Sequence, residues 1–89
     1  MGDITVQVLM FATAREISGT GQISLTVRSD CDTVQIRQLL AEKYPKLASM
    51  VLDEDTLTLA LNEEYLLPGQ CLPLKEGDTI ALIPPISGG

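Results

Sequence analysis

Apolar and polar residues alternate with a period of two along several short stretches of this chain. Such alternation predicts β-strands, because successive side chains of a strand point to opposite faces of a sheet. In the first stretch the alternation is lost after Gln7 and both faces become apolar, which predicts a central strand buried on both sides. The predicted strands are residues 4–11, 22–27, 56–61, 65–67 and 79–83.

One segment has helical periodicity instead and is predicted to form the main helix, between Asp32 and Tyr44. Asp32 can cap its N-terminus, and Gln35 stands three residues on, as in a capping box. Pro45 ends the helix, because the residue before a proline avoids helical geometry. Short helical turns are expected at residues 13–19 and 46–52. The apolar stripe is Ile36, Leu39, Leu40, Tyr44 and Leu47, and the solvent-facing side is Arg37, Gln38, Glu42 and Lys43.

The predicted order is strand, strand, helix, strand, short strand, strand. A single main helix can cover only one face of a sheet, so the chain is predicted to form a two-layer α+β domain. The first and last strands are strongly apolar and no turn joins them, which favours a parallel pair in the middle of a mixed sheet. This is the arrangement of the ubiquitin-like β-grasp fold, which we assign to residues 1–83.

Residues 84–89 are predicted to form an extended C-terminal tail. Proline fixes φ and lacks a backbone N–H, so a pair of prolines ends the last strand and stiffens the chain. Glycines without side chains would let the tail thread into a narrow channel of a partner protein. The tail consists of Pro84, Pro85, Ile86, Ser87, Gly88 and Gly89.

The composition excludes several kinds of chemistry. The chain has no histidine, which excludes histidine-based acid–base catalysis and catalytic triads, and no metal-ligand spacing occurs. Cys31 and Cys71 are expected to be free thiols in a reducing compartment. Twelve acidic and six basic residues give a net charge of −6, which argues against nucleic acids and anionic membranes as partners and favours a basic partner surface. Without a signal peptide or a long apolar run, we expect the cytosol.

The α-carboxylate of Gly89 is then the most distinctive reactive group. A carboxylate is a poor electrophile, because it is charged and offers no leaving group. Adenylation with ATP would produce an acyl adenylate, from which a sulfur nucleophile could displace AMP to leave a thiocarboxylate. A thiol and then a lysine amine could instead lead to an isopeptide bond. The catalysts would belong to partner proteins, and no cofactor is expected to bind stably.

Both ends of the chain resemble the molybdopterin synthase small subunits, which are ubiquitin-like sulfur carriers. Residues 8–19 (VLMFATAREISG) resemble the opening strand of that family with its Ala-Arg-Glu-hydrophobic-x-Gly motif. Residues 74–89 (LKEGDTIALIPPISGG) are similar to the family's ending. Ubiquitin, the thiamine-pathway carrier and the ubiquitin-related modifier share Gly-Gly alone, whereas both ends together with Pro-Pro are specific. Some bacterial members have two aromatic residues where this chain has Leu82 and Ile83.

The resemblance implies the non-catalytic, sulfur-donating subunit of a sulfurtransferase complex. An E1-like enzyme that consumes ATP would adenylate Gly89 and convert it to a thiocarboxylate, which would donate sulfur to cyclic pyranopterin monophosphate. The molybdopterin dithiolene needs two sulfurs, so two small subunits would flank a dimer of large catalytic subunits. Arg15 in the family motif, together with Leu82 and Ile83, is a candidate contact with this partner, although alternation sends Leu82 and Ile83 to opposite faces.

Three alternatives remain open. The chain could carry sulfur for thiamine, for tRNA thiolation or for cysteine. It could be a modifier that is conjugated to lysines, or a ubiquitin-like docking module with an inert tail. These functions share the fold and differ in the fate of Gly89.

Overall fold

The computed structural model describes residues 2–84, and the elements expected from the sequence are present in it, with shifts of a few residues at their ends. The strands are β1 (Asp3–Met10), β2 (Gln22–Arg28), β3 (Thr58–Leu61), β4 (Glu64–Tyr65) and β5 (Thr79–Ile83). The helices are α1 (Ala12–Ser18), α2 (Thr33–Lys43), the 3₁₀ turn η1 (Pro45–Leu47) and α3 (Ala48–Val51).

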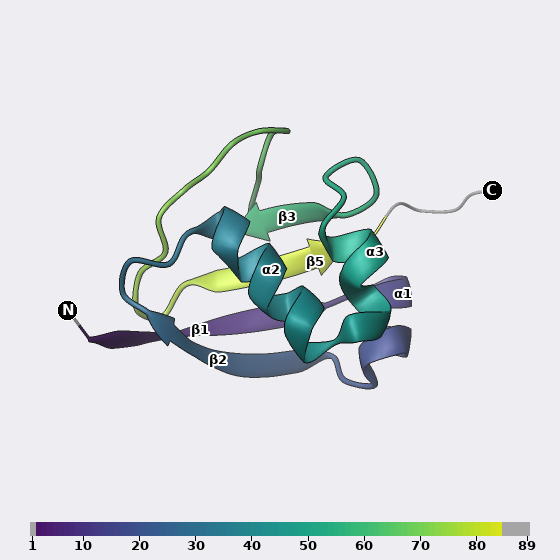
Figure 1. The fold of residues 1–89 in the computed structure, drawn as a ribbon, viewed down its shortest axis with the longest axis horizontal. Helices are drawn as coiled ribbons and strands as arrows, with labels where there is room; N and C mark the ends of the chain where they lie inside the picture. Colours follow the sequence, from purple (N-terminus) through teal and green to yellow (C-terminus); the bar gives the residue numbers. More distant parts are fainter. Residues whose placement is uncertain (1, 85–89) are drawn as a thin grey trace.

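The strands form one mixed sheet in the order β2-β1-β5-β3-β4 (Figure 1). β1 and β5 are parallel neighbours, with Val8 opposite Ile80 and Met10 opposite Leu82. β2 is antiparallel to β1, and β3 is antiparallel to β5. The predicted parallel pair of first and last strands is therefore confirmed, and so is the ubiquitin-like β-grasp fold.

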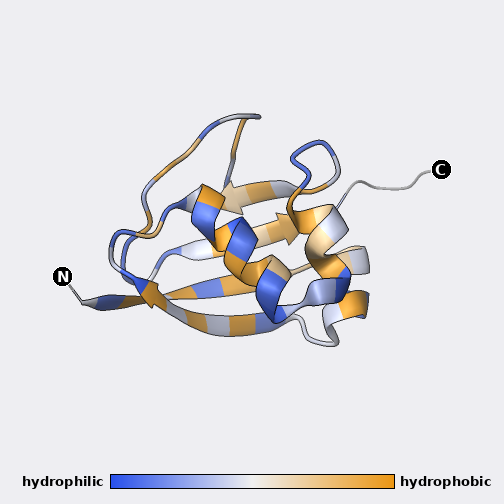
Figure 2. Ribbon diagram, in the orientation of Figure 1, coloured by the Kyte–Doolittle hydropathy of each residue, from blue (hydrophilic) through white to orange (hydrophobic). Residues whose placement is uncertain are grey.

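The helices pack on one face of the sheet, and the hydrophobic core lies between the two layers (Figure 1). The ribbon coloured by hydropathy shows strands banded in orange and paler colours, as alternating burial requires (Figure 2). In the described residues, no helix has the length and apolar character needed to cross a membrane. Core side chains that are at most 1% exposed include Val6, Val8, Ile36, Leu40, Leu47, Val51, Leu57, Ile80 and Leu82.

The start of α2 and the end of α1 are those that the sequence predicts. The Asp32 carboxylate accepts a hydrogen bond of 2.8 Å from the N–H of Gln35, and the Gln35 side chain accepts one of 3.2 Å from the N–H of Asp32. This capping box stabilises α2 by about 1 kcal/mol. α1 ends at Gly19, whose φ of 80° lies in the left-handed region that glycine adopts without strain.

Two side chains of α2 differ from the prediction. Leu39, assigned to the apolar stripe, is 39% exposed, because the stripe that faces the sheet is narrower than the pattern suggests. Arg37, assigned to the solvent-facing side, donates hydrogen bonds to the carbonyl oxygens of Val51 and Leu57. α3 packs against α2, so a position that is exposed on an isolated helix here lies beside the unpaired carbonyls of α3.

β3 begins later than predicted. The N–H groups of Thr56 and Leu57 both donate to the carbonyl oxygen of Asp53, at 3.0 Å, so these two residues belong to the turn that follows α3. β4 begins one residue before the predicted strand 65–67 and ends two residues before its end, at Tyr65. It begins earlier because the two-residue turn at Asn62 and Glu63 sets the register of the hairpin.

Candidate functional site

The end of β5 brings the chain to a defined place at one end of the sheet. Leu82 lies opposite Met10 of β1, and Ile83 lies opposite Thr58 of β3. β1 turns into α1 directly after Met10, so the chain leaves the sheet between the start of α1 and the start of β3 (Figure 1). Pro84, the last described residue, is buried at this exit. The remaining predicted tail residues lie outside the described residues: Pro85, Ile86, Ser87, Gly88 and Gly89.

The two residues before Pro84 have different environments. Leu82 is fully buried, and its register partners Met10 and Leu59 are core residues as well. Leu82 is therefore a core residue and not part of an exposed partner interface. Ile83 is partly exposed on the opposite face of the sheet. Alternation alone left this choice open, and the layer of helices decides it.

The sheet face opposite the helices carries an apolar surface close to this exit. Leu9, Ala81, Ala60 and Tyr65 are successive register partners across β1, β5, β3 and β4. Neighbouring strands lie about 4.8 Å apart, so these side chains form a continuous row. Ile83 follows two residues after Ala81 and hence shares its face. We call these five residues the open-face row. Tyr65 is exposed, Leu9, Ala81 and Ile83 are partly exposed, and the small Ala60 is buried among them.

Phe11 extends the open-face row beyond the end of β1. Its backbone is extended, with φ −120° and ψ 154°, and its side chain is 48% exposed. The prediction that the first strand is buried on both sides is therefore wrong, because helices cover only one face. Sequence reasoning missed Phe11 and Tyr65 as exposed apolar residues. The sequence did contain an indication for Phe11. It lies two residues after Leu9, the first apolar residue on the otherwise polar face of the strand, and so is expected on the same face.

The same face becomes polar away from the exit. The side-chain oxygen of Gln7 accepts hydrogen bonds of 3.0 Å from Ser24 and from Gln22 of β2. Thr79, at the start of β5, lies opposite Gln7 and on the same face. The apolar part of the face is thus confined to the end where the chain continues toward Gly89.

Arg15, the candidate contact from the sequence motif, lies on the exposed side of α1. Its side chain packs over Gly21, where a Cβ atom built on the glycine would lie 3.4 Å from Nε of Arg15. The buried Ala14 anchors α1 to the core. Within residues 2–84 the Arg15 guanidinium forms no ion pair, and its contact with a partner stays a prediction.

The Cys31 thiol shows no sign of activation in this fold. Burial raises the pKa of the Cys31 thiol, and the nearby carboxylates of Asp32 and Asp30 raise it further, so the thiol stays protonated at neutral pH. A protonated thiol is a weak nucleophile. Cys71 is an exposed free thiol. The expectation of two free cysteines is confirmed.

The acidic loop after α3 stabilises local structure. The Asp53 carboxylate accepts hydrogen bonds from the hydroxyl of Thr56 (2.7 Å) and from the N–H of Asp55 (2.9 Å), and these hold the pKa of Asp53 below its usual range. The Glu54 carboxylate accepts a hydrogen bond of 2.6 Å from the N–H of Gly69. In the described part of the chain, no group of three or more side chains is arranged to hold a metal ion.

Comparison with known sequences relates nearly the whole chain to sulfur carriers. Residues 8–89 match the ThiS family. The molybdopterin synthase sulfur carrier subunit of Caenorhabditis briggsae is 34% identical over 86 residues, which are 97% of this chain and 99% of that protein. The Homo sapiens subunit of the same name is 36% identical, over 94% of this chain and 93% of that protein. The similarity therefore extends well beyond the two end motifs.

Solved structures show the same fold. Small archaeal modifier protein 1 from Methanosarcina acetivorans superposes with a TM-score of 0.76 and 28% identity, over 100% of both chains. The complex of subunits 1 and 2 of the molybdopterin-converting factor from Helicobacter pylori contains a chain that superposes with a TM-score of 0.62. That chain is 22% identical, with 97% of this chain and 100% of that chain covered, and it is evidence for the fold alone.

Proposed function

This chain belongs to the ThiS family, and from that premise we propose that it is the sulfur carrier subunit of a molybdopterin synthase. Gly89 is adenylated, converted to a thiocarboxylate and used to donate sulfur to cyclic pyranopterin monophosphate. The observation that carries this proposal is that β5 ends beside the open-face row and leads directly into the segment that ends in Gly-Gly. The subunit thus supplies the reactive end of a sulfurtransferase, and its partners supply the catalytic residues.

The proposed chemistry proceeds in three steps. An oxygen of the Gly89 carboxylate attacks the α-phosphorus of ATP, and pyrophosphate leaves. A sulfide-level nucleophile from a sulfur donor then attacks the acyl carbon, the bond to AMP breaks, and a thiocarboxylate remains. The thiocarboxylate sulfur attacks a carbon of the pterin precursor and displaces an oxygen substituent, whose C–O bond breaks. Hydrolysis of the resulting thioester then leaves the sulfur on the pterin as a thiolate and returns the Gly89 carboxylate. The covalent intermediates divide one difficult substitution at the Gly89 carboxylate into steps that each have a lower barrier.

The side chains of the chain support a carrier role over a catalytic one. The chain has no histidine, and the Cys31 thiol is buried and protonated. The Asp53 carboxylate accepts a hydrogen bond from Thr56 of its own loop, and the Glu54 carboxylate accepts one from Gly69 of a neighbouring loop. Two free cysteines also fit the reducing cytosol, where we place the protein.

We further propose that the open-face row and Phe11 form the docking surface for two partners in turn. Grouped, exposed apolar side chains mark interaction sites, and aromatic residues such as Tyr65 carry much of the binding energy at interfaces. The partners are an E1-like activating enzyme and the large catalytic subunit. The Caenorhabditis briggsae and Homo sapiens relatives, which are 34% and 36% identical and are named as sulfur carrier subunits of molybdopterin synthase, support a partner of the second kind. Two sulfurs per dithiolene favour a heterotetramer of two small and two large subunits.

An intact-mass measurement tests the proposal. The purified chain is incubated with ATP, an E1-like enzyme and a sulfur donor, and replacement of one oxygen by sulfur at Gly89 is the expected result. A variant that lacks Gly89 is the matched control, and it should stay unmodified while melting at nearly the same temperature, because a terminal residue contributes little burial. An unchanged mass in an assay where an established carrier is thiolated would reject the proposal.

One observation favours a second function. Small archaeal modifier protein 1, which shares 28% identity with this chain over its full length, is named as a protein modifier. A modifier would transfer the adenylated Gly89 to a lysine amine instead of to sulfur. Tryptic peptides that carry a Gly-Gly remnant on lysine would support conjugation, whereas co-purification with a pterin-binding large subunit would support the molybdopterin synthase function.

A further inference from the structure

The outer edge of β2 is the unpaired edge on one side of the sheet. The N–H of Met10 donates to the carbonyl oxygen of Gly21, and the N–H of Ser29 donates to that of Gly2. These two bonds lie at the two ends of the ladder between β1 and β2 and show which residues form its hydrogen-bonded pairs. Hydrogen-bonded pairs recur at every second residue of an antiparallel ladder. The N–H and C=O groups of the odd-numbered β2 residues therefore point to β1, and those of the even-numbered residues point away from the sheet.

Backbone groups at both ends of this edge are hydrogen-bonded to nearby residues, whereas those in its middle are not. The backbone N–H and C=O of Gln22 are bonded to the Thr20 hydroxyl, and the C=O of Arg28 accepts from the N–H of Cys31. Among the described residues, the backbone groups of Ser24 and Thr26 have no further partner. Such an edge is a template for an added strand. β2 carries no proline that would prevent this pairing.

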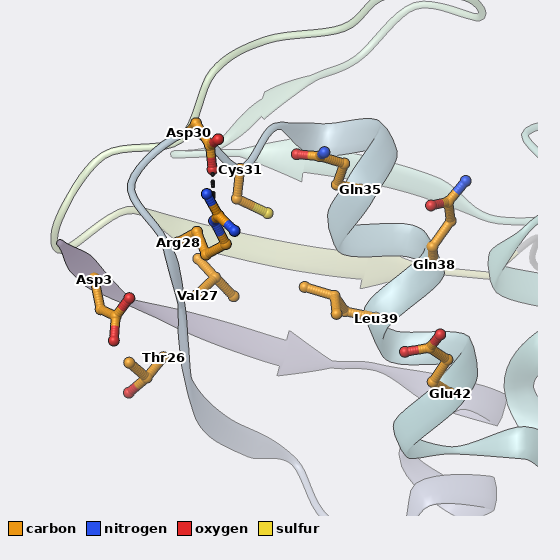
Figure 3. Close-up of a pocket in the computed structure, with 10 residues that line it drawn as sticks. All are labelled: Asp3, Thr26, Val27, Arg28, Asp30, Cys31, Gln35, Gln38, Leu39 and Glu42. Carbon is orange, nitrogen blue, oxygen red and sulfur yellow. Dashed lines mark ion pairs between the residues drawn. The ribbon is translucent and has the colours of Figure 1, made fainter. Parts of the chain in front are cut away.

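A hollow of about 570 Å³ lies beside this edge, between β2 and α2 (Figure 3). We call it the β2–α2 hollow. Leu39 of α2 and Val27 of β2 form its apolar part, together with the Cys31 side chain. A strand added to β2 directs every second side chain to the helix side of the sheet, where the hollow lies. Leu39 was predicted to be buried but is exposed in the hollow, so its side chain can provide an apolar contact for the side chains of an added strand.

The charges around the hollow favour a basic ligand. Asp3, Asp30 and Glu42 line it with one basic residue, Arg28, which pairs with Asp30 at 3.4 Å. Asp30 and Glu42 lie toward opposite ends of the hollow in the close-up (Figure 3). Acidic groups at both ends match basic residues on both sides of a short apolar segment. Pairing of two β2 edges from two copies is less favourable, because each copy has a net charge of −6 and the copies repel one another.

We propose that the β2 edge and the β2–α2 hollow bind an extended segment of a partner protein by strand addition. The segment has apolar residues at alternate positions and Lys or Arg on both sides. This surface lies at the β2 edge, whereas the tail exit lies between α1 and β3, so both can be occupied at once. The inference does not depend on the proposed sulfur chemistry.

The test uses the full-length protein and a fluorescent peptide, Lys-Arg-Val-Thr-Val-Thr-Val-Lys-Arg. Saturable binding is expected, with slower hydrogen exchange of the Ser24 and Thr26 amides. A peptide with Glu and Asp at the flanks should bind at least about tenfold more weakly. No saturable binding, or protection confined to the open-face row, would overturn the proposal. Self-association of the free protein through β2, seen by sedimentation with protection of the same amides, would overturn it as well.

Two matched pairs of variants locate the site. Thr26→Pro removes the outward N–H and should weaken binding at least about tenfold, whereas Thr26→Val keeps this N–H and should bind within about twofold of the native protein. Leu39→Lys should weaken binding similarly, and Leu52→Lys, at an exposed leucine outside the hollow, should not. Thermal melts check the fold, and the Leu39 pair decides the question if Thr26→Pro unfolds. Equal binding by Leu39→Lys and Leu52→Lys would overturn the proposal.

Discussion

Arg37 of α2 donates a hydrogen bond of 2.9 Å to the carbonyl oxygen of Leu57, twenty residues further along the chain. A second bond of 2.7 Å joins the same guanidinium to the carbonyl of Val51, the last residue of α3. The final carbonyls of a helix lack partners within that helix. The Arg37 side chain therefore completes α3 and positions the segment that leads into β3.

Replacing Arg37 by methionine should destabilise the fold by about 2–3 kcal/mol, because two partly buried carbonyls lose a charged donor. Urea denaturation followed by circular dichroism measures the change. Arg28→Met is the matched control: the ion pair of Arg28 with Asp30 is exposed, and its loss should cost less than about 0.5 kcal/mol. Equal stability of the two variants would contradict the role assigned to Arg37.

The hairpin between β3 and β4 contains a strained residue. Leu61 pairs with Glu64, and both residues between them have positive φ, 51° at Asn62 and 74° at Glu63. This geometry fits a type I′ turn, for which Asn-Gly is the preferred sequence. Glu63→Gly removes the strain of the left-handed conformation but also adds entropy to the unfolded chain, which offsets part of the gain. The net expectation is a rise of about 0.5–1 kcal/mol in the free energy of unfolding.

Asn62→Gly provides the contrast in the same turn. The Asn62 side chain accepts a hydrogen bond of 2.9 Å from the N–H of Thr79 and donates one of 3.0 Å to Asp78. Its removal should lower stability by about 1 kcal/mol, because both bonds are lost. If Glu63→Gly destabilised the protein as much as Asn62→Gly, the turn assignment would be wrong.

Asp53 should contribute a pH-dependent part of the stability. Hydrogen bonds from the Thr56 hydroxyl and the Asp55 N–H lower the pKa of Asp53 in the folded state. The folded state thus binds the proton more weakly than the unfolded state, whose aspartate pKa is about 3.9. The stabilisation is present above that pH and is lost as the pH falls through the lower, folded pKa.

Urea melts of the native protein and of Asp53→Asn, recorded between about pH 6 and pH 2, test this contribution. The native protein should be the more stable of the two above about pH 4, and the difference should shrink on acidification. Thr56→Val, which removes the hydroxyl donor, should reduce the pH dependence. A stability difference that is independent of pH would show that Asp53 does not act through its charge.

Tyr65 should contribute to partner binding with little effect on the fold, if the proposed docking surface is correct. Its side chain is 68% exposed in the open-face row. Tyr65→Ser should weaken binding to the large subunit by about tenfold, as truncation of an aromatic interface residue commonly does. Leu67→Ser is the control, because Leu67 is equally exposed but lies beside a hollow with Thr33 and Val34 of α2. Calorimetry that found both variants equal would argue against the open-face row.

Leu82 should behave in the opposite way to Tyr65. Its side chain is fully buried between β1 and β3, so Leu82→Ala leaves a cavity and should destabilise the fold by about 2–5 kcal/mol. Ile83→Ala, one residue further on and partly exposed, should cost clearly less. Thermal and urea melts measure both changes, and the reverse order would mean that the face assignment is wrong.

Much of the fold follows from local patterns. The period-two stretches identify the strands, the pair Asp32 and Gln35 marks the start of α2, and Gly19 marks the end of α1. Each of these signals acts within a few residues, through backbone geometry or a nearby hydrogen bond. For that reason they can be recognised without any knowledge of the tertiary structure. The pairing of the first and last strands was also predictable, because only these two are strongly apolar.

The elements, their order and the chemistry available to the chain can all be read from the sequence, which has Gly-Gly in its last segment and no histidine. Three features depend on how the elements pack together. Leu82 is buried and Ile83 partly exposed, Phe11 and Tyr65 extend an uncovered apolar face, and Arg37 bonds to α3. These features cannot be read from the sequence, because the environment of a side chain depends on which distant segment covers it. Alternation separates two faces of a strand, but the position of the helices determines which face becomes the core.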